Sequence, residues 1–121
     1  MEFIINGLIS LVVIWFLIKQ LIPVRGVSQI GTCDVKKILK DKGYQFIDVR
    51  TPYEFKTNHI HGFKNIPLPQ IKQRHNELSK DKEVVVICQS GMRSNKATRI
   101  LKKLGFAKIT NVKGGMAAWR S

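Results

Sequence analysis

The sequence EVVVICQSGMRS, residues 83–94, decides the fold of this chain. Four consecutive branched apolar residues, Val84 to Ile87, favour an extended backbone, and the lack of apolar–polar alternation predicts a strand that is buried on both faces, as in a parallel sheet. A helix is expected directly after the loop, over residues 94–104, because apolar residues recur there at i, i+3, i+4 and i+7. The stretch therefore predicts a strand, a short polar loop and a helix in immediate succession.

Cys88 lies where the buried strand ends and the helix is about to begin. The free backbone N–H groups of the loop and first helical turn converge on that point, and the helix dipole makes it positive. Arg93 adds a full charge, and Gly91 suits a backbone that turns tightly around a bound group. These features favour a thiolate, so Cys88 is predicted to be a nucleophile. The alternative is a buried cysteine at a strand end, followed by an ordinary loop.

The spacing within the loop narrows the chemistry. Four residues separate Cys88 from Arg93, which gives the pattern C-x-x-G-x-R. Cysteine phosphatases resemble this layout but have one residue more, which makes a ring wide enough for a tetrahedral phosphate. A smaller loop suits a single extra sulfur atom on the cysteine. The stretch resembles the active-site loop of rhodanese (sulfurtransferase) domains, in which the cysteine carries a persulfide.

Three further segments carry the same resemblance. They are IDVR at residues 47–50, HIHGFKNIP at 59–67 and GGMAAW at 114–119, with Phe63 where the family usually has alanine. Together with the loop they occur in the order of the family. The resemblance implies an α/β fold with a rhodanese-like parallel sheet and helices on both faces. We assign residues 27–121 to this domain.

The resemblance also implies an activity. The chain would be a thiosulfate sulfurtransferase-type enzyme, in which Cys88 is the catalytic residue and moves a sulfane sulfur through a persulfide. The donor would be thiosulfate or a per- or polysulfide, the acceptor would be a thiol or cyanide, and no metal or organic cofactor is expected. Two alternatives remain: a non-catalytic binding or regulatory module, and a persulfide relay to a protein partner. The residues expected to bind the substrate are those of the loop: Gln89, Ser90, Gly91, Met92, Arg93 and Ser94.

Supporting residues are expected at the carboxyl end of the second predicted strand, the edge where open α/β sheets build their sites. Asp48 would accept hydrogen bonds from the loop region or pair with a basic residue. Arg50 would add positive charge to the pocket or pair with a carboxylate such as Glu54. We interpret His59 as a residue that orders its loop. His61 lies two positions away without metal-ligand spacing, so no metal site is predicted.

The amino-terminal segment, residues 1–22, is predicted to be a single transmembrane helix, joined to the domain by a linker at 23–26. Residues 3–18 are almost entirely apolar, and about twenty residues of helix match the hydrocarbon thickness of a bilayer. A signal peptide would carry basic residues before the apolar run, where this chain has Glu2. The third alternative, a buried core helix, is disfavoured because the domain looks complete without it.

Charge predicts the orientation of the anchor and the partners of the domain. Lys19 and Arg25 flank the carboxyl end of the apolar run, so the domain should face the cytoplasm from the cell membrane. The two cysteines, Cys33 and Cys88, form no disulfide framework and fit a reducing compartment. The net charge of +13 would attract anionic donors and anionic lipids, or is simply a solvated basic surface. Nucleic acid is an unlikely partner because no aromatic–basic interleaving occurs.

The rest of the chain predicts ordinary structural elements. We expect strands over 27–30, 44–49 and 108–112, and helices over 35–41, 51–56, 68–78 and 116–119. Thr32 or Asp34 is expected to cap the first of these helices. Gly114 and Gly115 are interpreted as turn glycines, and Cys33 as a small, partly buried apolar residue.

Overall fold

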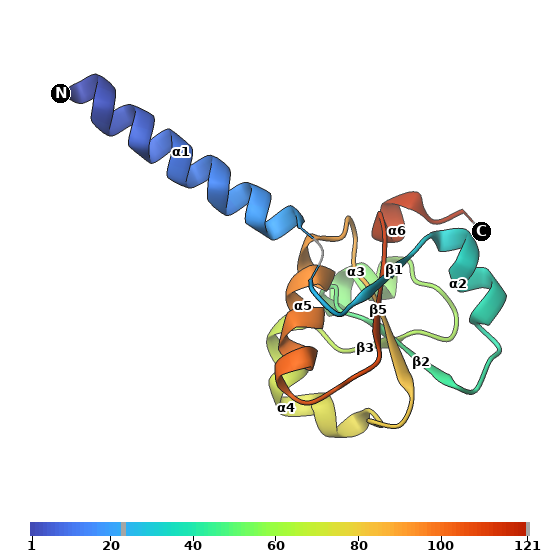
Figure 1. The fold of residues 1–121 in the computed structure, drawn as a ribbon. Coiled ribbons are helices and arrows are strands. Elements are labelled where there is room, and N and C mark those ends of the chain that lie inside the picture. Colours follow the sequence, from blue (N-terminus) through green and yellow to red (C-terminus); the bar gives the residue numbers. More distant parts are fainter. Residues whose placement is uncertain (23, 121) are drawn as a thin grey trace.

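The fold is built around a parallel five-stranded sheet, as the computed structural model shows (Figure 1). The structure describes residues 1–22 and 24–120; Pro23, in the predicted linker, and Ser121, in the predicted domain, lie outside the described residues. The strand order is β1-β5-β4-β2-β3, and all neighbouring strands are parallel. The strands are β1 (Ser28–Ile30), β2 (Tyr44–Asp48), β3 (Lys64–Asn65), β4 (Glu83–Ile87) and β5 (Ile109–Val112).

The central strand β4 is buried on both faces, which confirms the prediction from its unbroken apolar run. Val84 and Val86 face a core formed with Ala97 and Leu101, whereas Val85 faces a second core on the other side of the sheet. All three valines are fully inaccessible to solvent. A strand enclosed in this way has no solvent face that would require polar residues.

Helices cover both faces of the sheet, so the predicted fold class is confirmed. The helices are α2 (Thr32–Ile38), α3 (Pro52–Thr57), α4 (Ile71–Arg74), α5 (Met92–Lys103) and α6 (Gly115–Ala118), with 3-10 turns at Leu68–Gln70 and His75–Glu77. Ile71 of α4 and Leu101 of α5 belong to one core. Val35 of α2, Phe55 of α3 and Met116 of α6 pack into the other.

Several predictions about local structure were wrong. The helix expected over 35–41 runs instead from Thr32 to Ile38. The expected helix over 68–78 is divided into two 3-10 turns and the four-residue α4, and a short strand forms at Lys64–Asn65, where none was expected. Gly31, rather than Thr32 or Asp34, is the N-cap of α2. Asp34 instead accepts a hydrogen bond from the Gly31 amide at 3.2 Å, because its side chain lies in the first turn and reaches back.

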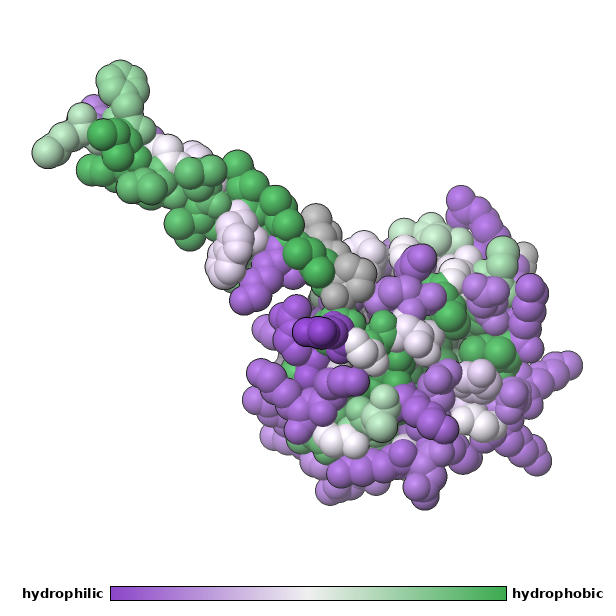
Figure 2. Space-filling model, in the orientation of Figure 1, coloured by the Kyte–Doolittle hydropathy of each residue, from purple (hydrophilic) through white to green (hydrophobic). Residues whose placement is uncertain are grey.

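The amino-terminal helix α1 (Glu2–Leu21) projects away from the domain (Figure 1). Figure 2 shows it as a hydrophobic rod beside a domain whose visible face is largely hydrophilic. Its segment Glu2–Lys19 is long and apolar enough to cross a bilayer, and none of that segment is buried inside the protein. The carboxyl-terminal half of α1 approaches α5, where Phe16 helps to line a pocket.

Candidate active site

Cys88 immediately follows β4, and its side chain is fully buried beneath the loop that leads into α5. The Gly91 amide donates a hydrogen bond to the Cys88 Sγ at 2.9 Å. The Cys88 thiol donates to the Ser94 hydroxyl oxygen at 3.3 Å, and that hydroxyl donates to the Gly91 carbonyl at 3.0 Å. The sulfur therefore lies inside a closed polar ring at the amino terminus of a twelve-residue helix.

Gly91 makes this ring possible through its backbone. It is the N-cap of α5 with φ +112° and ψ −16°, a left-handed backbone conformation that residues with a Cβ rarely adopt. The turn directs the Gly91 N–H inward to the sulfur. An N–H fixed in this way also stabilises a thiolate or an anionic persulfide, because the donor and the helix dipole act on the same atom.

Asp48 and Arg50 form a buried ion pair under the loop. The Asp48 side chain is inaccessible and Arg50 is 3% exposed, while the Arg50 Nη2 lies 2.8 Å from the Asp48 Oδ2. Arg50 also donates to the Asn58 carbonyl at 2.6 Å and to the Gln89 Oε1 at 3.4 Å. Of the alternatives, Asp48 therefore pairs with a basic residue. The partner of Arg50 is Asp48 rather than Glu54, and Gln89 links the pair to the loop.

Glu54 pairs with Arg93, a contact that the sequence did not predict. The Arg93 Nη1 lies 2.6 Å from the Glu54 Oε1, and the Arg93 Nη2 lies 2.9 Å from the Oε2, which is a bidentate geometry. Hydrogen bonding from Arg93 lowers the pKa of Glu54 to about 2. The same pairing raises the pKa of Arg93 above its ordinary value. Arg93 is therefore held at the rim of the loop, with part of its charge already neutralised.

This ion pair predicts a pH dependence of stability. The pKa of Glu54 is about 2 in the folded chain and near 4.3 when unfolded, so its stabilising effect is complete above pH ~4.5 and is lost as the pH falls towards 2. Because the Glu54 side chain is 29% exposed, solvent screening limits the effect to about 1 kcal/mol.

The variant Glu54→Gln tests this dependence, because glutamine can still complete the capping box with Thr51. Urea denaturation of both proteins in detergent micelles should give a difference of about 1 kcal/mol at pH 7 that vanishes near pH 2. The salt-bridged Glu77, whose pKa is also about 2, is present in both proteins and cancels from the difference. A difference that is constant from pH 7 to pH 2 would contradict the role of this ion pair.

Gly115 supports the loop from behind, although the sequence suggested only a turn. The Met116 amide donates to the Cys88 carbonyl at 2.8 Å, and the Ala117 amide donates to the Gln89 carbonyl at 2.9 Å. Gly115 has φ +57°, and a Cβ there would clash with the Cys88 carbonyl oxygen. The start of α6 thus fixes the backbone of the loop, and only glycine fits between the two.

Gly115→Ala should displace the loop. Its left-handed backbone and the contact with the Cys88 carbonyl oppose the new methyl group together, so we expect a loss of about 2 kcal/mol in unfolding free energy. The rate of the reaction predicted for Cys88 should fall at least about tenfold. Gly62→Ala is the matched control, because its φ is +103° while the nearest atom, the Leu39 Cδ2, is 3.8 Å away. Equal losses of activity in the two variants would show that contact with the loop is irrelevant.

The remaining predicted residues lie further from the sulfur. His59 stacks on Phe55 with ring centroids 3.9 Å apart, and its Nδ1 is 2.7 Å from the Phe55 carbonyl oxygen, which fits a residue that orders its own segment. Cys33 is exposed on α2, so its predicted partial burial was wrong. Among residues 1–22 and 24–120, no three metal-ligating side chains gather at one point.

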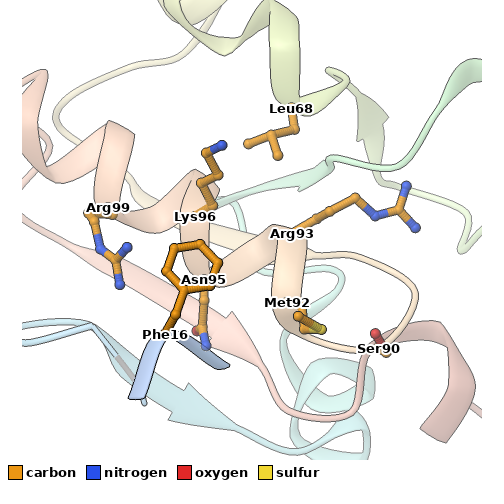
Figure 3. Close-up of a pocket in the computed structure, with 8 residues that line it drawn as sticks. All are labelled: Phe16, Leu68, Ser90, Met92, Arg93, Asn95, Lys96 and Arg99. Carbon is orange, nitrogen blue, oxygen red and sulfur yellow. The ribbon is translucent and has the colours of Figure 1, made fainter. Parts of the chain in front are cut away.

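A pocket of about 620 Å³ adjoins the loop (Figure 3). Ser90 and Met92 lie at one end, and Phe16 of α1 forms part of its wall. The other lining residues are Leu68 and four from α5: Arg93, Asn95, Lys96 and Arg99. Of the predicted loop residues, Ser90, Met92 and Arg93 therefore face this pocket, whereas Cys88, Gln89 and Ser94 do not line it.

Comparisons with known proteins agree with this geometry. The family model described as Rhodanese-like domain matches residues 33–121. The uncharacterized protein YqhL of Bacillus subtilis (strain 168) is 51% identical over 62% of this chain and 60% of its own length, less than two thirds. A protein named sulfurtransferase, from Allochromatium vinosum, is 37% identical over 60% of this chain and 68% of its own. The crystal structure of a rhodanese-like domain protein from Staphylococcus aureus is 33% identical with a TM-score of 0.72, covering 78% of this chain and 93% of that one.

Proposed function

Because the chain belongs to the rhodanese-like domain family, we propose that it is a membrane-anchored sulfurtransferase that carries sulfane sulfur as a persulfide on Cys88. The observation that carries the proposal is the hydrogen bond from the Gly91 amide to the Cys88 Sγ, at the amino terminus of α5. A fixed donor and a helix dipole directed at one sulfur can stabilise the negative charge of a persulfide formed there.

The reaction has two steps. The Cys88 thiolate attacks the outer sulfur of the donor, so that a new sulfur–sulfur bond forms while the bond inside the donor breaks. With thiosulfate, the bonding pair leaves with sulfite and the enzyme retains an anionic persulfide. A nucleophilic acceptor then attacks the outer persulfide sulfur; cyanide leaves as thiocyanate, whereas a thiol becomes a persulfide. The Cys88 thiolate is regenerated without any redox reagent.

The residues around Cys88 support specific roles in these steps. The Gly91 N–H can stabilise the thiolate and the persulfide, and Ser94 lies 3.3 Å from the sulfur, from where its hydroxyl can turn to donate. Arg93 is held by Glu54 at the loop rim, where it can attract an anionic donor without closing over the sulfur. The ion pair between Asp48 and Arg50 fixes the base of the loop through Gln89.

We propose that α1 attaches the chain to a membrane. The segment Glu2–Lys19 has the length and composition of a membrane span, and its apolar side chains are exposed in the structure. The basic residues after the span favour an orientation in which the domain lies on the cytoplasmic side of the cell membrane. There the net charge of +13 would attract anionic donors and anionic lipids.

A donor comparison tests the proposed function with the full chain in detergent micelles or nanodiscs. Thiocyanate formation from cyanide is measured with thiosulfate, and persulfide transfer to a thiol is measured with a low-molecular-weight persulfide or polysulfide. Saturable turnover with any of these donors supports the enzyme. Binding of the donors without turnover would instead identify a binding or regulatory module. Release of the chain from membranes by alkaline carbonate would contradict the proposed membrane anchor, but it would not bear on the sulfurtransferase activity.

A further inference from the structure

The pocket beside the catalytic loop has two chemically different sides. Phe16 and Leu68 supply apolar surface, whereas Lys96 and Arg99 supply positive charge. Figure 3 shows Phe16 reaching from α1 to the same space that the side chains of α5 line. Met92, which is 43% exposed, lies at the end nearest the loop. The pocket thus joins the reactive loop to the proposed membrane anchor.

The pocket is larger and more apolar than thiosulfate requires. Its volume of about 620 Å³ lies in the range of about 300–1,000 Å³ that holds drug-sized ligands, whereas thiosulfate has a handful of atoms and no apolar part. An ion of that size would leave Phe16 and Leu68 without a partner. A ligand that fills the pocket needs a hydrocarbon portion as well as a reactive group.

The charges select an anionic ligand. Lys96 and Arg99 form no ion pair with any residue that the structure describes, whereas Arg93 is already paired with Glu54. Both cations stand on α5 one turn apart and line the same pocket, so that both attract a negative group bound there. Ser90 and Met92 line the same pocket, at the end nearest the loop.

The position of Phe16 places the pocket at a membrane surface, if α1 is anchored as proposed above. Phe16 precedes Lys19, the residue that ends the apolar span, by about one helical turn. In an inserted helix this level is the boundary between headgroups and acyl chains. A hydrocarbon chain could therefore enter the pocket from the bilayer, while its head remains in the aqueous layer.

From these observations we infer that the pocket binds an anionic amphiphile, and that this ligand is a sulfane-sulfur donor with a hydrocarbon tail. An alkanethiosulfonate, R–SO₂–S⁻, represents the class. The Cys88 thiolate attacks the terminal sulfur, the bond between the two donor sulfurs breaks, and the electron pair leaves with the sulfinate R–SO₂⁻. One anion is consumed and one released, so the step needs no oxidant, reductant or proton.

A chain-length series tests the inference. We would measure kcat/KM of the full chain in nanodiscs with methane-, butane- and octanethiosulfonate, and with thiosulfate as a separate donor. Burial of each methylene should raise kcat/KM about two- to fourfold until the pocket is full. If thiosulfate is a donor but kcat/KM does not rise along the series, the inferred amphiphilic ligand is wrong, whereas the proposed sulfurtransferase function is still supported. Failure with all four donors would instead count against the proposed function.

The variant Leu68→Gln distinguishes binding of the hydrocarbon tail in the pocket from simple partitioning of the donor into the bilayer, because Leu68 lines the pocket but does not belong to the anchor. The ratio of kcat/KM for the octyl to the methyl donor should fall at least about fivefold in this variant. Leu39→Gln, a partly buried leucine at the opposite face of the sheet, should keep the wild-type ratio. Equal ratios in wild type, Leu68→Gln and Leu39→Gln would show that the gain arises in the membrane, which overturns the inference.

The charged side is tested with Lys96→Gln and Arg99→Gln. Each should raise KM for the octyl donor by about three- to tenfold, whereas Lys103→Gln, which also stands on α5 but outside the pocket, should not. Nanodiscs of zwitterionic and of anionic phospholipid distinguish the two sources of an anionic amphiphile. If anionic phospholipid competes with the donors and abolishes the rise of kcat/KM with chain length, the pocket is a lipid site and the inferred donor class is wrong.

Discussion

Cys88→Ser is expected to lower the rate of sulfur transfer by at least about 10³-fold with every donor. Serine has nearly the shape of cysteine and can still accept the hydrogen bond from the Gly91 amide, so the loop should keep its structure. Its hydroxyl is a far weaker nucleophile and cannot hold a persulfide, because that intermediate needs a bond between two sulfur atoms. The assay is thiocyanate formation from thiosulfate and cyanide.

Cys33→Ser is the matched control for this change. Cys33 is exposed on α2, so its replacement should leave transfer within about twofold of wild type. The unfolding free energy of both variants should remain within about 1 kcal/mol of wild type, as urea denaturation would report. Substantial turnover in Cys88→Ser, or loss of turnover in Cys33→Ser, would show that Cys88 is not the residue that carries the reaction.

Asp48→Ala is expected to destabilise the fold by about 3–5 kcal/mol, a large share of the 5–15 kcal/mol typical of a folded domain. The Asp48 carboxylate is inaccessible to solvent and accepts hydrogen bonds from the Arg50 side chain and from the Arg50 amide. Its removal leaves the guanidinium of Arg50, which is 3% exposed, without its counter-ion. An uncompensated buried charge accounts for most of the cost.

Two companion variants show whether charge burial is the cause. Asp81→Ala removes an exposed carboxylate and should change the unfolding free energy by less than about 0.5 kcal/mol. The double variant Asp48→Ala/Arg50→Met removes both charges and should regain part of the loss, because no buried ion remains unpaired. A loss below 1 kcal/mol in Asp48→Ala itself would show that the pair is not important for stability.

Local patterns in the sequence were sufficient to predict the sheet and the loop that carries Cys88. The run Val84 to Ile87 predicted the central strand because burial on both faces imposes an unbroken apolar sequence. Cys88 was placed at the carboxyl end of the strand because the apolar run ends there and a helical pattern of apolar residues begins shortly afterwards. Both signals lie within about twenty consecutive residues, so no knowledge of distant contacts was needed.

Contacts between distant segments could not be predicted in this way. Glu54 reaches Arg93 across 39 positions, whereas the sequence suggested the nearby Arg50 as its ion-pair partner. Gly115 appeared to be a turn glycine because the clash that excludes a side chain comes from the Cys88 carbonyl. The two-residue β3 was missed because its pairing with β2, rather than its own composition, makes it a strand.

The pocket beside the loop is a further result of tertiary structure. Phe16 and Lys96 lie 80 positions apart, and they line one pocket because α1 lies against α5. Hydrophobicity alone identified α1 as a candidate anchor and gave no reason to connect it with the chemistry of Cys88. The structure shows that one apolar residue of this helix lines the space next to the reactive loop.

The most direct test of the account is the intact mass of the full chain after incubation with thiosulfate or a polysulfide donor and removal of excess reagent. We predict a gain of about 32 mass units, the mass of one sulfur atom, which peptide mapping locates at Cys88 and cyanide discharges as thiocyanate. Cys88→Ser should gain no mass. An unchanged mass of wild type with every donor, or added sulfur on Cys33 alone, would contradict a persulfide on Cys88.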